Sequence, residues 1–172
     1  NNTSILEVKT LNIQKTNILE KGIGTLFIEY QYLAAIKKYF KDVKFDLILY
    51  STPPITFSKI IQFIKKKDNA VSYLLLKDIF PQNAVDMKMF KENGLLHLMF
   101  KRKEKKLYRL SDYIGCMSEA NKTYILKHNP ELNPHKVEVN PNTIEPIVLY
   151  LSEDDKIQLK MKYKLPLDKK IF

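Results

Sequence analysis

The chain has 172 residues, which suits one domain and is too short for two full-sized ones. Hydrophobic residues make up 45% of it and charged residues 28%, which is ordinary for a globular protein and argues against disorder. Its formal charge of +10 indicates an anionic partner, such as nucleic acid, an anionic membrane surface or a phosphorylated ligand. Because the chain has one cysteine, it cannot form an internal disulfide framework. Its four glycines lack the spacing of a Walker loop or of a dinucleotide-binding fingerprint. No apolar run reaches the roughly 18–20 residues that a membrane span needs.

The first half of the sequence alternates between strand and helix patterns. Alternating apolar residues predict a strand, apolar residues at helical spacing predict a helix, and unbroken apolar runs predict buried strands. These patterns predict a strand over 5–11, a helix over 25–40, a strand over 45–50 that two prolines end, a helix over 56–64 that Thr56 caps and three lysines follow, and a strand over 71–76.

The second half continues the alternation, with capping residues and turn residues marking the ends of the helices. It is predicted to contain helices over 83–92 and 95–110 separated by an Asn-Gly stop, a strand over 112–117, a helix over 118–128 capped by Ser118, a strand over 136–139, a helix over 152–163 capped by Ser152, and the start of a strand at 169–172.

The three central strands, which begin near Phe45, Val71 and Asp112, are apolar on both faces. Such strands are typical of a parallel sheet that helices cover on both sides. The predicted fold is therefore a Rossmann-like three-layer α/β sandwich with a parallel sheet.

The predicted domain organisation is a Rossmann-like domain over 1–150, followed by a helix and connector over 151–172. The sequence opens without methionine and closes inside a strand pattern, so we expect it to be a piece of a longer protein. A processed protein with a short apolar tail is the alternative.

Ligands of open parallel sheets bind outside the carboxyl ends of the strands. Segments 50–54, 77–83, 117–121 and 140–143 follow the four predicted strands and are rich in small polar residues and proline. The alternative is that they are ordinary turns, because the same residue types dominate turns. The candidate binding residues in these segments are Ser51, Thr52, Pro53, Gln82, Asn83, Ser118 and Asn142.

Lys77 and Asp78 are the strongest candidates for a functional site, because they directly follow a predicted buried strand. Asp78 could take or hold a proton from a hydroxyl group, and Lys77 could bind a phosphate or carboxylate. A structural ion pair, or an aspartate that caps the next turn, is the alternative. Ser118 could bind an anion at a helix start, or it could simply cap that helix.

No metal site is predicted, because the three histidines are not spaced as metal ligands. Cys116 lies in the middle of a predicted strand and is expected to be a small core residue.

The predicted helix over 95–110 carries a dense basic stretch after an apolar start. Contact with anionic lipid headgroups is the functional interpretation, and a solvated outer helix face is the structural one. Nucleic acid is not expected, because the chain has only two arginines and no recognisable nucleic-acid-binding motif. The predicted membrane-contact residues are Lys101, Arg102, Lys103, Lys105, Lys106 and Arg109.

Several segments, in this order and spacing, resemble glycosyltransferase family 4, in its fucosamine-transferase-like branch. The resemblance rests on 74–86 (LLLKDIFPQNAVD), similar to the family's DxWPxS/NA segment, and on 46–54 (DLILYSTPP), 113–118 (YIGCMS) and 136–142 (KVEVNPN). Segments 10–15 (TLNIQK) and 21–24 (KGIG) add to it, and it covers about residues 5–145.

The resemblance implies a GT-B architecture, of which this chain is the N-terminal, acceptor-side domain. It implies a retaining hexosyltransferase without metal or cofactor in O-antigen or capsule synthesis, with a nucleotide-sugar as donor and a lipid-diphosphate-linked sugar as acceptor. The implied location is cytoplasmic, peripheral on the inner face of the cytoplasmic membrane. The implied C-terminal domain, with its E-x7-E pair, is expected to follow in the same parent chain.

This sequence departs from the family pattern at three positions. Lys77 stands where many relatives have histidine, Phe80 replaces the usual tryptophan, and Asn142-Thr143 replaces the Asn-Gly of the family's PNG turn. The resemblance implies that Lys77 and Asp78 lie at the catalytic site, with Asp78 as a positioning residue. The alternative function is a non-enzymatic basic module that binds an anionic membrane surface or nucleic acid.

Overall fold

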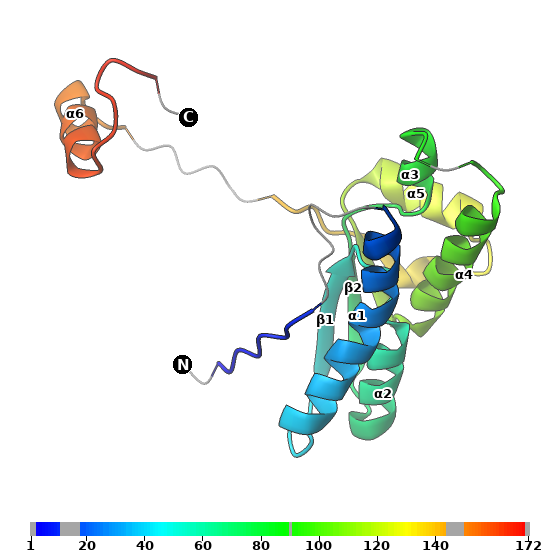
Figure 1. Ribbon diagram of the computed structural model, residues 1–172. Coiled ribbons are helices and arrows are strands. Elements are labelled where there is room, and N and C mark those ends of the chain that lie inside the picture. The colour runs from blue at the N-terminus through cyan, green and yellow to red at the C-terminus, as the bar shows by residue number, and fades with distance from the viewer. Residues whose placement is uncertain (1–2, 11–17, 90, 144–149, 171–172) are drawn as a thin grey trace. The chain divides into compact units, whose positions relative to one another are not determined.

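The computed structural model describes residues 3–10, 18–89, 91–143 and 150–170 (Figure 1). The chain divides into two compact units, residues 1–142 and 143–172, so the predicted boundary at residue 150 lies inside the second unit. Within the described part of the chain, no helix combines the length and the apolar character needed to cross a membrane.

The first unit is built on a four-stranded sheet in which every neighbouring pair is parallel and the strand order is β1-β2-β3-β4. The fold is mixed α/β, with a parallel sheet flanked by helices, as predicted for a Rossmann-like fold (Figure 1). The strands are β1 (Leu47–Thr52), β2 (Val71–Leu76), β3 (Tyr113–Cys116) and β4 (Val137–Val139).

Helices connect successive strands and pack against the sheet or against each other. The second unit contains α6 (Glu153–Lys162), which the predicted cap Ser152 begins with a capping box to Asp155. The first unit contains α1 (Ile18–Tyr39), α2 (Ser58–Asp68), α3 (Gln82–Asp86), α4 (Leu95–Leu110), α5 (Glu119–His128) and the short 3-10 helix η1 (Pro134–Lys136).

The core lies on one face of the sheet. Tyr50, Leu74, Ile114 and Val137 are paired in register across the four strands and are all buried. They belong to one apolar cluster with residues of α2, α4 and α5, including Ile61, Leu107 and Ile125. Helix α1 packs on α2 through a second cluster around Ile60 and Ile64.

The opposite face of the sheet is exposed among the described residues. Leu47 is 55% exposed, Leu49 61%, Val71 43% and Tyr113 48%. The apolar character of these strands predicts burial on both faces, but the described helices cover the other face only. Right-handed crossovers between strands in sequential order place each connecting helix on the same side of a sheet, which explains the one-sided cover.

Three predicted elements are wrong or shortened. Residues 5–10 form no strand, Ile5 is largely exposed, and Leu11 lies outside the described residues. The helix predicted over 83–92 ends at Asp86, because Lys88 takes the left-handed conformation (φ 58°) and the Met89 N–H bonds back to the Ala84 carbonyl. Residues 169–170 form no strand, and 171–172 lie outside the described residues, as does most of segment 10–15.

Thr56 does not cap α2. The cap position is Phe57, which offers no side-chain acceptor, and the buried Thr56 hydroxyl has no hydrogen-bond partner among the described residues. The basic last turn of α2 is as predicted, with three lysines at the negative end of the helix dipole.

Candidate functional site

The four candidate loops lie at one edge of the sheet. Thr52, Leu76, Cys116 and Val139 are the last residues of the four strands, and they are paired in register. The loops that follow these residues therefore begin side by side, as the placement rule for open parallel sheets predicts.

The loops after β1 and β2 are joined by a hydrogen bond. The Thr52 hydroxyl donates to the Asp78 carbonyl oxygen at 3.3 Å, and Thr52 is 1% exposed. Thr52 thus holds the two loops together and is not open to a ligand. Ser51 is half-buried, and Pro53 is exposed at the same edge.

The side chains of Lys77 and Asp78 are both exposed. Within the described residues, neither side chain makes an ion pair, and neither has a hydrogen bond to a side chain or to the backbone. A structural ion pair and an aspartate cap were the alternatives for this pair, and the described structure contains neither. An ammonium group and a carboxylate are therefore open to solvent at the carboxyl edge of the sheet.

Gln82 and Asn83 begin α3 in the same loop. The Gln82 side-chain amide donates to the Asp86 carboxylate at 2.9 Å, so it stabilises the short helix. The Asn83 Oδ1 atom is buried and has no partner among the described residues. A buried acceptor without a donor costs free energy, and the Thr56 hydroxyl and the Asn129 Oδ1 atom are in the same state, so this atom is not an open contact point for a ligand.

Ser118 caps α5, since its hydroxyl accepts from the Asn121 N–H at 3.2 Å. The structural alternative for Ser118 is thus confirmed, and the hydroxyl is engaged within the chain. Asn142 is exposed in the loop after β4.

A polar group that the sequence pattern does not predict lies on the open face of the sheet. The Tyr73 hydroxyl donates to Glu138 Oε1 at 2.5 Å and accepts from the Asn140 side-chain amide at 2.9 Å. Burial, followed by the hydrogen bond to Glu138, raises the pKa of Tyr73. Gly115 lies beneath, where an added Cβ would meet the tyrosine oxygen at 2.5 Å. Strand alternation places these residues on one face, but only the register brings them together.

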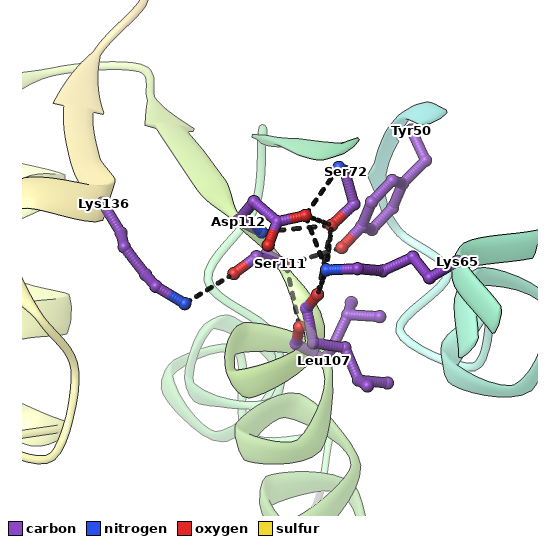
Figure 2. Close-up of polar contacts among 8 residues, drawn as sticks. Tyr50, Lys65, Ser72, Leu107, Ser111, Asp112 and Lys136 are labelled. Carbon is purple, nitrogen blue, oxygen red and sulfur yellow. Dashed lines mark hydrogen bonds and ion pairs between the residues drawn. The ribbon is translucent and has the colours of Figure 1, made fainter. Parts of the chain in front are cut away.

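A second polar cluster lies at the opposite edge of the sheet, where β2 and β3 begin (Figure 2). The Asp112 carboxylate accepts from Lys65 at 2.5 Å and from the Ser72 N–H and hydroxyl at 2.9 Å each. Burial opposes ionisation of Asp112, but these hydrogen bonds outweigh it and lower its pKa. Each polar group is satisfied by its neighbours, so the cluster joins α2, β2 and β3 and is structural.

Tyr50 and Lys136 extend this cluster (Figure 2). The Tyr50 hydroxyl is 2.6 Å from Ser111 Oγ, which donates to the Leu107 carbonyl at 2.8 Å. Burial raises the pKa of Tyr50 to about 12. Lys136 donates to the Ser111 carbonyl at 3.2 Å and ties the start of β4 to the end of α4.

A small cavity of about 20 Å³ lies between the Ile79–Gln82 loop and the helices α4 and α5, and His97, Glu104 and Asn129 also line it. Glu104 is 6% exposed and accepts from the Tyr108 hydroxyl at 2.8 Å. Burial raises the pKa of Glu104 to about 7, against the lowering effect of that hydrogen bond and of Lys101 and Lys105. His97 accepts from the Asn93 N–H at 2.9 Å and is a core histidine.

The described residues contain no cluster of three histidine, cysteine or acidic side chains that could hold a metal ion. Cys116 is fully buried in the core, as predicted, and burial raises its pKa to about 11, so it is a thiol at neutral pH.

The basic residues of α4 differ in exposure, and none of them is among the buried residues of the helix, which are His97, Glu104, Leu107 and Tyr108. Lys105 is paired with Glu131 at 3.0 Å. Arg102, Lys106 and Arg109 are exposed, and Lys101, Lys103 and Lys105 are half-buried.

Comparison with known proteins assigns no family to this chain. No protein family model matches it, and no curated protein matches it either.

Proposed function

We propose that this chain is the acceptor-binding half of a retaining sugar transferase. The observation that carries the proposal is the pair Lys77 and Asp78, whose side chains project into solvent at the carboxyl edge of a parallel sheet, free of partners among the described residues. They stand in the segment that resembles the DxWPxS/NA motif of glycosyltransferase family 4, and that resemblance supplies the reaction class.

The proposed roles follow from the chemistry of the two side chains. The Lys77 ammonium neutralises a phosphate of a lipid-diphosphate-linked acceptor, and the Asp78 carboxylate accepts a hydrogen bond from the acceptor hydroxyl and orients it. The nucleotide-sugar donor is proposed to bind mainly to a second domain of a longer parent chain, so this chain alone should transfer no sugar.

Acceptor binding tests this proposal without knowledge of the donor. The probe is a short prenyl diphosphate-linked N-acetylhexosamine, titrated into the chain by calorimetry. Lys77→Ala should weaken binding about tenfold or more, because a charge-assisted phosphate contact is lost. The matched control Lys66→Ala removes an exposed lysine from α2 and should leave binding unchanged.

Two results would refute the proposal. One is a chain that does not bind the probe. The other is a chain whose affinity falls equally in Lys77→Ala and Lys66→Ala, since that result indicates attraction by net charge alone. In a parent protein that transfers sugar, Asp78→Ala should reduce turnover far more than it reduces stability, and unchanged turnover would remove Asp78 from the site.

A further inference from the structure

The N-terminal end of α4 and the loop before it expose apolar side chains. Leu95 is 86% exposed, Leu96 52% and Leu98 42%, and the loop adds Met87 at 71% and Met89 at 62%. Apolar side chains exposed singly are ordinary, but here they follow one another along one short stretch of chain. We call these five residues the apolar tip.

The outer face of α4 continues from the apolar tip as a basic stripe. Leu95, Arg102 and Arg109 are seven residues apart, so they lie almost in line along the helix, with Lys106 beside them. The core residues His97, Glu104, Leu107 and Tyr108 occupy the opposite side of the helix. The outer face is therefore apolar in its first turn and cationic beyond it.

The charged side chains of this stretch are mostly basic. Residues 87–109 contain eight basic and two acidic side chains, and one of the acidic ones, Glu104, is buried and bonded to Tyr108. Glu92 is the remaining exposed carboxylate in this stretch. Apolar side chains next to a cationic helix face fit a surface that is apolar inside and anionic at its boundary.

We infer that the apolar tip inserts into an anionic lipid bilayer while Arg102, Lys106 and Arg109 contact its headgroups. The segment between β2 and α4 contains Lys77 and Asp78 and then Met87 and Met89, so the tip follows Lys77 and Asp78 along the chain. The inference rests on the surface of α4 and not on the proposed sugar transfer, so either can fail without the other.

The test uses co-sedimentation of the chain with vesicles of phosphatidylcholine, alone or mixed with phosphatidylglycerol, at low and high salt. The chain should bind the mixed vesicles, and Arg102→Glu with Lys106→Glu should weaken that binding about tenfold or more. The control Lys66→Glu with Lys127→Glu changes the net charge equally, at two exposed positions on α2 and α5, and should weaken binding far less. Equal loss in both double variants would overturn the inference.

Insertion can be read from tryptophan fluorescence, because the chain contains no tryptophan of its own. Leu95→Trp should shift to shorter wavelength on anionic vesicles and be quenched by brominated lipid, whereas Leu49→Trp, on the open face of the sheet, should not. An unchanged Leu95→Trp spectrum in vesicle-bound protein would overturn insertion. Tight, salt-dependent binding to duplex DNA without vesicle binding would assign the basic stripe to nucleic acid and would also overturn the inference.

Discussion

The buried carboxyl group of Glu104 should make the stability of this protein depend on pH. Glu104 is 6% exposed between α4 and the core, and the Tyr108 hydroxyl donates to it at 2.8 Å. Burial raises its pKa from the ordinary value of 4.5 to about 7. The substitution Glu104→Gln keeps the shape and the acceptor for Tyr108 and removes the charge.

The sign and size of the effect follow from this pKa. The folded state holds the Glu104 proton more tightly than the unfolded chain, so the stability from this group is fully present below pH 4.5 and is lost as the pH rises through about 7. The shift corresponds to about 3 kcal/mol between those limits. Glu104→Gln should therefore gain up to about 3 kcal/mol relative to the original chain as the pH rises through this range.

Urea unfolding followed by circular dichroism at several pH values measures this difference. The two curves of unfolding free energy against pH should diverge above pH 4.5 and run parallel again above about pH 7 to 8. Glu92→Gln, an exposed carboxylate just before α4, is the control and should follow the original chain. Parallel curves for Glu104→Gln across the whole range would refute the burial of an uncharged Glu104.

Three further predictions concern structural contacts, each measured by the same unfolding assay. Asp112→Asn should lower the free energy of unfolding by about 1 kcal/mol at neutral pH, because the hydrogen bonds from Lys65 and Ser72 favour the charged carboxylate. This loss should shrink as the pH falls through the lowered pKa of Asp112. A loss that does not change with pH would contradict a contribution from the carboxylate charge. Gly115→Ala should cost about 1–3 kcal/mol, because its Cβ would lie 2.5 Å from the Tyr73 oxygen and 2.9 Å from the Asn140 Cβ, and Tyr73→Ala should recover part of that loss. Ser118→Ala should cost about 1 kcal/mol through the lost cap of α5, and Ser118→Asn should restore most of it.

The parallel α/β fold could be predicted because its signals are local. Three apolar runs, each followed by a helix pattern, are sufficient to indicate parallel strands joined by crossover helices. Helix α4 was predicted with its observed bounds because its periodicity is long and Gly94 precedes it. The end of α3 was not predictable in this way, because Lys88 adopts a left-handed conformation that its residue type does not favour.

The candidate site could be predicted only as far as the edge on which it lies. Strand ends locate Lys77, Asp78 and Asn83 from the sequence alone. Two other properties depend on tertiary contacts that no spacing reveals: the burial of Thr52, which makes it a link between loops, and the grouping of Tyr73 with Glu138 across β3. The engagement of Ser118 as a cap was one of two alternatives that only a hydrogen bond could decide.

The exposure of one sheet face and the position of the site follow from the same topology. Because the strand order is sequential, α2, α4 and α5 pack into one apolar cluster on one face, and the loops after the strands meet at the carboxyl edge. The open face brings Leu49, Tyr73 and Tyr113 into register without a described helix above them. A substitution such as Leu49→Ser therefore removes little buried area in the described structure, whereas Leu74→Ser, on the covered face of the neighbouring strand, places a hydroxyl in the core. The free energy of unfolding should therefore fall far more for Leu74→Ser than for Leu49→Ser, and equal losses would contradict a core on one face of the sheet.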